Sequence, residues 1–130
     1  MLRTKCILAE PSANDGRRVC VMRRLTLNDG VTPDYRLPGR FDEHWLLLAP
    51  PDKLLGDYYK RGLSWVGYVE QYLAHLNKPE VRQKINELVT RAREEDITLL
   101  CIEDTPEHCH RRLIALYCLT IDADLKVDIS

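Results

Sequence analysis

The sequence has almost no net charge, because its 19 lysines and arginines are balanced by 20 aspartates and glutamates. Without a basic excess, no long-range electrostatic field draws the chain to nucleic acid or to an anionic membrane surface. The sequence also has no apolar run near the roughly 20 residues that a membrane-spanning helix requires. Nucleic acid and membranes are therefore not the partners that we expect.

The first residues lack the pattern of a secretory signal, and the cysteines lack a pairing pattern. The segment "MLRTKCILAEPSANDG" turns polar after a short apolar run, which is not the pattern of a signal peptide. The five cysteines, an odd number, favour free thiols over a disulfide framework. We therefore expect a cytoplasmic protein with reduced cysteines.

The residues that are present suit one packed domain. Of the 130 residues, 45% are hydrophobic and 30% are charged, a composition that favours a folded core over disorder. The sequence has neither an internal repeat nor a low-complexity segment. We expect residues 1–130 to form a single compact domain.

Two β-like segments open the chain. Residues 4–10 and 17–27 are rich in branched and alternating apolar residues, which is typical of strands. Between them, residues 14–16 (Asn-Asp-Gly) have strong turn chemistry and predict a hairpin with a long loop. Residues 28–42 contain two glycines and two prolines, and they predict a long loop of the kind that is often functional or mobile.

The middle of the chain has the apolar periodicity of helices. Ser64 is a typical N-cap, and Asn77 and Pro79 suit the start of a further helix. We predict helices over residues 52–60, 64–76 and 78–95.

A strand and a helix follow. Residues 96–103 form a nearly unbroken apolar run, which is typical of a strand covered on both faces. Residues 105–107 (Thr-Pro-Glu) predict the start of a helix that continues through Ile121, and residues 123–130 suit a last strand. This order predicts an α/β domain: a small mixed sheet, partly parallel, with helices packed on it and a Rossmann-like strand–helix unit near the C-terminus.

Reactive side chains crowd the junction between that strand and that helix, in the segment "CIEDTPEHCHRR" from Cys101 to Arg112. The carboxyl ends of parallel strands are the usual ligand site of an α/β domain. A helix N-terminus attracts anions, and Arg111 or Arg112 can bind them with two hydrogen bonds. The segment therefore predicts a polar pocket for a small anionic ligand.

Cys109 is the candidate nucleophile or redox thiol, because a position near a helix N-terminus beside His110 and Arg111 favours its thiolate. His110 or Glu103 is the candidate proton carrier. The alternative is that Cys109 is a half-buried helical cysteine without a reactive role. Cys101, inside the strand, is expected to be a buried thiol.

A metal site is the less favoured interpretation of the same segment. Cys101, Glu103, His108, Cys109 and His110 are the right ligand types for zinc. No C-x-x-C pair is present, however, and histidines at positions i and i+2 of a helix point apart. The sequence therefore predicts no metal ligand and identifies no cofactor.

Three segments resemble a known family: "EPSANDGRRVCVMRR", "LAPPDKLLGDYYKRGLSWVGYVEQYLAHL" and "ITLLCIEDTPEHCHRRLIA". They are similar, in the right order and over most of the chain, to the domain-of-unknown-function family 488 (DUF488), in its YeaO-like branch. The resemblance implies a compact α/β fold and the place of a site, without supplying a reaction.

The residues that match the polar signature of the family are Cys101, Glu103, Cys109, His110 and Arg111, together with Arg23 or Arg24 at the end of the second predicted strand. The arginines and Cys101 are the candidate ligand-binding residues. One departure concerns the loop after that strand, where the branch usually has W-P-R-G and this chain has "RRLTLNDG". The arginine expected there is missing or displaced to Arg36 or Arg40.

The sequence thus favours a Cys/Glu/His/Arg pocket that belongs to an enzyme or an anion-binding protein for a small phosphorylated or nucleotide-like ligand. A non-catalytic binding or regulatory module is the first alternative. A metal-binding protein is the second.

Overall fold

The computed structural model describes residues 1–130 and contains one five-stranded sheet with the order β3-β2-β4-β1-β5. Every pair of neighbouring strands is parallel. The α/β class is confirmed, whereas the predicted mixed sheet is in fact entirely parallel. The strands are β1 (Leu2–Cys6), β2 (Arg17–Cys20), β3 (Glu43–His44), β4 (Ile97–Cys101) and β5 (Val127–Ile129).

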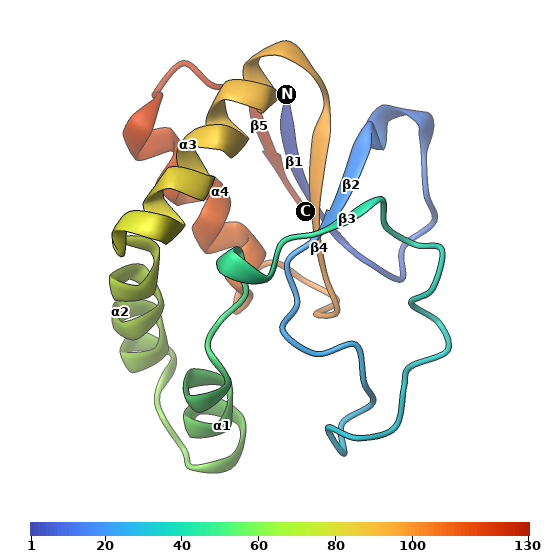
Figure 1. Ribbon diagram of the computed structural model, residues 1–130, viewed down its shortest axis with the longest axis vertical. Helices are drawn as coiled ribbons and strands as arrows, with labels where there is room; N and C mark the ends of the chain where they lie inside the picture. The colour runs from blue at the N-terminus through green and yellow to red at the C-terminus, as the bar shows by residue number, and fades with distance from the viewer.

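All four α-helices lie on one side of the sheet, and irregular segments cover the other side (Figure 1). The main core forms between the helices and the sheet, where apolar residues such as Leu99 of the central strand are fully buried. None of the helices has the length and apolar character needed to cross a membrane. The helices are α1 (Asp52–Lys60), α2 (Trp65–Leu76), α3 (Pro79–Glu94) and α4 (His110–Ile121), with short 3-10 turns η1 (Ala13–Asp15) and η2 (Leu46–Leu48).

The three predicted helices in the middle of the chain are confirmed as α1, α2 and α3. The Ser64 hydroxyl caps α2 by accepting a hydrogen bond from the Gly67 N–H at 3.0 Å. The prediction that Asn77 caps α3 is wrong, because the N-cap is Lys78. Asn77 ends α2 instead, and its side-chain oxygen accepts the Tyr117 hydroxyl.

The predicted hairpin between the first two strands is wrong, because β4 lies between β1 and β2. Residues 7–16 therefore return across the sheet face that the helices leave free, where Thr98 Oγ1 donates to the Asp15 carbonyl at 2.7 Å. The Asn-Asp-Gly turn ends this crossover. Gly16 has a φ of +60°, and a Cβ there would lie 2.1 Å from the Asp96 carbonyl oxygen, so only glycine fits.

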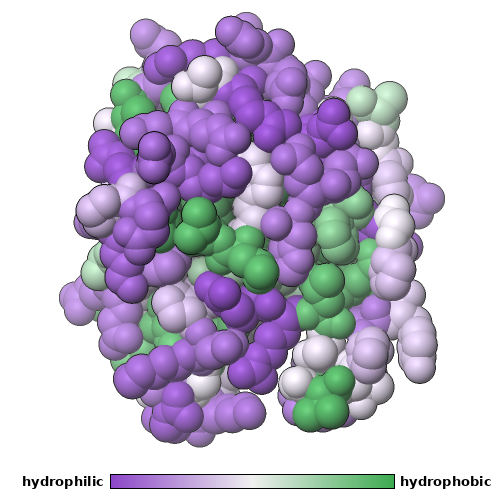
Figure 2. Space-filling model, in the orientation of Figure 1, coloured by the Kyte–Doolittle hydropathy of each residue, from purple (hydrophilic) through white to green (hydrophobic).

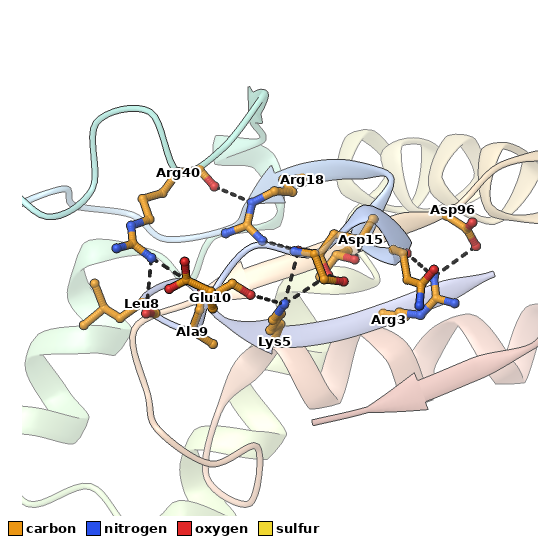
Figure 3. A network of polar contacts seen from close by, with 12 residues as sticks. Arg3, Lys5, Leu8, Ala9, Glu10, Asp15, Arg18, Arg40 and Asp96 are labelled. Carbon is orange, nitrogen blue, oxygen red and sulfur yellow. Dashed lines mark hydrogen bonds and ion pairs between the residues drawn. The ribbon is translucent and has the colours of Figure 1, made fainter.

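A buried ionic network holds the crossover on the sheet (Figure 3). The Asp15 carboxylate, 3% exposed as a residue, pairs with Arg18 and with Lys5. Arg18 Nε also donates to the Arg40 carbonyl at 2.6 Å. Burial tends to raise the pKa of Asp15, but hydrogen bonds from the Ser12 backbone N–H, Lys5 and Arg18 lower it overall.

The long loop is confirmed, although it begins earlier than predicted because β2 ends at Cys20. An isolated antiparallel bridge joins Thr26 to Pro33 within it. Leu37 is buried against a second, smaller apolar cluster that includes Cys20 and Leu100. These contacts attach the loop to the sheet next to the carboxyl end of β4.

The predicted start of the last helix at residues 105–107 is also wrong, because α4 begins at His110 with Cys109 as its N-cap. Thr105, Glu107 and His108 are exposed, whereas Cys109 and the next two residues are buried. A helix over residues 105–108 would have no apolar face to bury, so its formation would gain little. Cys109 consequently lies at the helix N-terminus and not one turn inside the helix.

Candidate active site

A pocket of about 540 Å³ opens at the carboxyl ends of β2 and β4. Its walls come from the segment after β2, from α1, from the end of β4 and from the first residue of α4. Figure 2 shows the molecule indented between the side of α1 and the side of the long loop. The carboxyl ends of parallel strands are where α/β domains usually bind ligands.

Cys101 and His110 face each other at the floor of this pocket, and only 4% and 6% of their surfaces are exposed. His110 Nε2 lies 2.7 Å from the Val21 carbonyl oxygen. Because a carbonyl can only accept, Nε2 carries the proton in the neutral ring. The unprotonated Nδ1 lies 3.7 Å from Cys101 Sγ, so the imidazole is oriented to accept the thiol proton.

Arg111 lies behind this pair and is completely buried. Its Nη1 donates to the Glu103 carbonyl at 2.8 Å and contacts Cys109 Sγ at 3.4 Å, while Nε donates to the Ser130 carbonyl at 3.0 Å. No aspartate or glutamate side chain pairs with this guanidinium, and its Nη2 has no hydrogen-bond partner. A buried cation of this kind favours negative charge on the neighbouring sulfur atoms.

The two neighbouring thiols have pKa values shifted in opposite directions. A hydrogen bond from the Cys109 thiol lowers the pKa of Cys101 in spite of burial, and the Glu103 backbone N–H and Arg111 act in the same direction. The same hydrogen bond, with Cys109 as donor, raises the pKa of Cys109 together with burial. The charge of this thiol pair is therefore expected on Cys101, the sulfur that lines the pocket.

Glu103 lines the pocket two residues beyond β4. Its Oε1 accepts a hydrogen bond of 2.7 Å from the Tyr59 hydroxyl on α1. Partial burial of this hydroxyl and the bond to Glu103 raise the pKa of Tyr59, so the phenol remains protonated and keeps donating. One carboxylate oxygen is thereby occupied, and the other can exchange protons with a bound molecule.

Basic side chains contribute part of the pocket wall, and the candidate ligand-binding residues Arg23 and Arg24 are among them. Arg23 donates to backbone carbonyls of the segment that leads to α1, including Pro50 at 3.0 Å. Arg24 Nε pairs with Asp52 at 3.1 Å. Lys60, at the end of α1, also lines the pocket and has no ion-pair partner.

Arg36 and Arg40, the two candidates to replace an arginine of the family pattern, do not line the pocket. Arg36 pairs with Asp34 in its own loop at 2.7 Å. Arg40 donates to the carbonyls of Leu8 and Ala9 in the crossover. Both arginines stabilise loop structure, so the basic groups at the site come from other positions.

Most of the chain matches one family. A model of the family DUF488-N3a, described as the active DUF488-N3 subclade, matches residues 2–119. The chain belongs to the DUF488 family. The resemblance of the sequence to DUF488 is thus confirmed, and the matched segment includes every predicted site residue from Arg23 to Arg111. No curated protein and no solved structure matches the chain.

In this DUF488 protein, one group of side chains has the geometry to hold a thiophilic metal ion. The sulfur atoms of Cys101 and Cys109 and a ring nitrogen of His110 lie within 4.8 Å of one another. Glu103 and His108 are not part of the group, and the His108 ring stacks on Trp65 at 4.7 Å. The guanidinium of Arg111 beside Cys109 Sγ opposes a further cation, so we propose no metal function.

Two residues of the pocket wall, Tyr59 and Lys60, are absent from the sequence-based prediction of the DUF488 site. Tyr59 lies within the helix predicted for residues 52–60, yet 59% of its surface is exposed and its hydroxyl reaches Glu103. The partners are 44 positions apart in the chain. Local periodicity contains no signal for such a contact, which only the packing of α1 beside β4 creates.

Proposed function

We propose that this protein is a thiol-dependent enzyme that acts on a small anionic, phosphorylated molecule, with Cys101 as nucleophile and His110 as its base. The contact that supports this most directly is the 3.7 Å approach of Cys101 Sγ to His110 Nδ1. The Val21 carbonyl orients the ring for that contact, which gives the three-part arrangement of an activated nucleophile. The description of the matched subclade as active agrees with an enzyme.

The reaction begins with transfer of the Cys101 thiol proton to His110 Nδ1. The thiolate attacks an electrophilic carbon or phosphorus of the substrate, a bond from sulfur to that atom forms, and the bond to the leaving group breaks. The leaving group takes the proton from His110, with Glu103 as the second proton carrier on the pocket wall. Water then attacks the sulfur-bound group, gives its proton to His110 and releases the Cys101 thiolate.

The roles of the two cysteines in this proposal differ from the expectation for the sequence, where Cys109 is the nucleophile. Cys109 does not line the pocket, and its pKa is raised. Cys101 lines the pocket, and its pKa is lowered. Cys109 therefore acts as a positioning residue that donates a hydrogen bond to the Cys101 thiolate.

An anionic substrate is supported by the charges around the pocket. Lys60 has no ion-pair partner, and Arg23 is bound only to backbone carbonyls. The N-terminus of α4, which begins at a pocket residue, adds backbone N–H groups and a partial positive charge. These groups suit a phosphate, and the acid Glu103 beside them suits proton transfer to its leaving group.

The proposal is tested by the rate of alkylation with iodoacetamide as a function of pH, with the modified residue identified by peptide mass. We expect alkylation of Cys101 at neutral pH to exceed that of free cysteine, whose pKa is about 8.5. Titration of thiolate ultraviolet absorbance gives the same pKa without depending on reagent access. A Cys101 that titrates no lower than free cysteine overturns the nucleophile role.

Matched variants make the assignment specific. Cys101→Ser is expected to remove the fast alkylation, whereas Cys118→Ser, which changes a buried cysteine of α4, is expected to retain it. Inorganic phosphate is expected to slow alkylation of Cys101 in the wild type and less so in Lys60→Ala. Protection by phosphate without an acidic Cys101 thiol would instead indicate a non-catalytic binding module.

A further inference from the structure

Cys101 and Cys109 form a close pair among the five free cysteines. Their sulfur atoms lie within 4.8 Å of each other, and a disulfide requires about 2.05 Å. A shift of a few ångströms would therefore join them. Cys6 is the β1 neighbour of Cys101 in the sheet, but its sulfur approaches the Ile102 carbonyl and is not part of the cluster.

The two sulfur atoms differ in access. Cys101 lines the pocket, whereas Cys109 is 2% exposed and does not. A small reagent in the pocket thus meets Cys101 first and Cys109 only through Cys101. This order of access matches the first and second thiols of a two-cysteine oxidation.

The segment between the two cysteines is able to move. Cys101 is held in β4 at the centre of the sheet, but residues 102–109 form neither a helix nor a strand. The Cys109 N–H donates only a long hydrogen bond, to the Pro106 carbonyl at 3.3 Å, and the Cys109 carbonyl accepts one from the Arg112 N–H at 3.2 Å. Displacement of Cys109 toward Cys101 would therefore break few strong hydrogen bonds.

We propose that Cys109 is the resolving thiol of Cys101, so that a small hydroperoxide in the pocket converts the pair into a disulfide. The inference rests on the proposed function in one respect, the reactivity of Cys101. It adds a class of reagent that the pocket admits and a modification that stops the reaction reversibly.

The disulfide between Cys101 and Cys109 forms in two steps. The Cys101 thiolate attacks one oxygen of hydrogen peroxide, the O–O bond breaks, and the departing hydroxide takes a proton from solvent to become water, which leaves a sulfenic acid on Cys101. Cys109 then gives its proton to His110, and its thiolate attacks the Cys101 sulfur. The S–O bond breaks, and the second hydroxide takes the proton from His110. Two thiols are oxidised and one peroxide is reduced to two waters.

The disulfide would remove the Cys101 thiolate from the pocket and protect it from further oxidation. Without a resolving thiol, a sulfenic acid can be oxidised irreversibly. A dithiol reductant would restore both cysteines by thiol–disulfide exchange. The enzyme would thus be switched off under peroxide and recovered afterwards.

The test is peroxide treatment of the wild-type protein, followed by thiol titration in denaturant and peptide mapping. We expect the number of free thiols to fall from five by two. Trypsin leaves both cysteines in one peptide, Glu94–Arg111, whose mass should be lower by two hydrogen atoms. Cleavage after Glu103 and Glu107 should give two fragments that separate only after reduction.

Matched cysteine variants give the second readout. Cys109→Ser should accumulate a sulfenic acid on Cys101 that dimedone traps, whereas Cys6→Ser and Cys118→Ser should form the disulfide as the wild type does. The mapping of the wild type does not depend on whether Cys109→Ser folds.

Three results would overturn the inference: a dimedone adduct on Cys101 of the wild type without a disulfide, a Cys6–Cys101 disulfide, or no oxidation at all. Alkylation by iodoacetamide separates the two proposals. If Cys101 alkylates fast and peroxide forms no disulfide, only the resolving role of Cys109 fails. If Cys101 has an ordinary pKa, the proposed function fails with it.

Discussion

Two buried arginines, Arg18 and Arg111, lie in very different surroundings. Arg18 is 8% exposed and pairs with the Asp15 carboxylate on the sheet face without helices. Arg111 is 0% exposed and meets only carbonyl oxygens and the Cys109 sulfur, at the carboxyl end of β4. Each arginine leaves its Nη2 atom without a hydrogen-bond partner. The two arginines therefore differ in the negative charge that compensates the guanidinium.

The comparison separates a stabilising network from a reactive one. Around Arg18 the compensating anion is a carboxylate that is charged at neutral pH, so the network is complete in the resting protein. Around Arg111 the only side chains able to become anionic are the thiols. A buried charge without a compensating partner is typical of sites where pKa values are shifted and side chains are reactive.

The largest effect on stability is expected when the Arg18 network is broken. Asp15→Asn removes the charge that compensates Lys5 and Arg18 while keeping the size of the side chain. We expect a loss of about 3–5 kcal/mol in the free energy of unfolding, measured by urea denaturation. Glu87→Ala, which breaks the surface pair with Lys84, should cost no more than about 1 kcal/mol.

Arg111→Met is expected to affect reactivity more than stability. The substitution removes a buried charge that no aspartate or glutamate compensates, which offsets part of the cost of leaving the Glu103 and Ser130 oxygens without their donor. The Cys101 thiolate loses a stabilising charge. Alkylation of Cys101 at neutral pH should fall about tenfold for each unit by which its pKa rises. The neighbouring Arg112→Met should leave the rate unchanged; an equal loss in both variants would contradict the role of Arg111.

The two regions should also differ in how their stability depends on pH. The pKa of Asp15 is lowered from 3.8, so its contribution is complete above that value and is lost as pH falls through the folded pKa. The pKa of Cys101 is lowered from 9.0, so its contribution is complete only above pH 9.0 and is lost as pH falls from there through its folded pKa. Both differences are measured by the free energy of unfolding of the wild type, Asp15→Asn and Cys101→Ser as a function of pH. If the three curves run parallel, the two regions do not differ in the pH dependence of their stability.

The smallest effect is expected from Tyr59→Phe, which removes the hydrogen bond to Glu103 on an exposed ring. The stability loss should be within about 1.5 kcal/mol. Protection of Cys101 by inorganic phosphate should weaken, because Glu103 loses the donor that moderates its charge. Tyr58→Phe is the adjacent control, since only Tyr59 donates to Glu103, and it should leave protection by phosphate unchanged.

The helices and the class of fold follow from local patterns in the sequence. Apolar residues at helical spacing and the Ser64 cap define α1, α2 and α3 where they were predicted. The nearly unbroken apolar run of residues 97–101 defines a strand that is buried throughout. These features depend on residues a few positions apart, which is why the sequence is sufficient for them.

The sequence by itself also determined the family and the strand–helix junction where the polar residues gather. Only the tertiary structure decided that β4 lies between β1 and β2, that α4 begins at His110, and that Cys101 and not Cys109 lines the pocket. Each of these outcomes depends on burial and pairing between residues distant in the chain. Local propensities in the sequence do not specify such contacts, because the free energy that selects them arises only when the whole core packs.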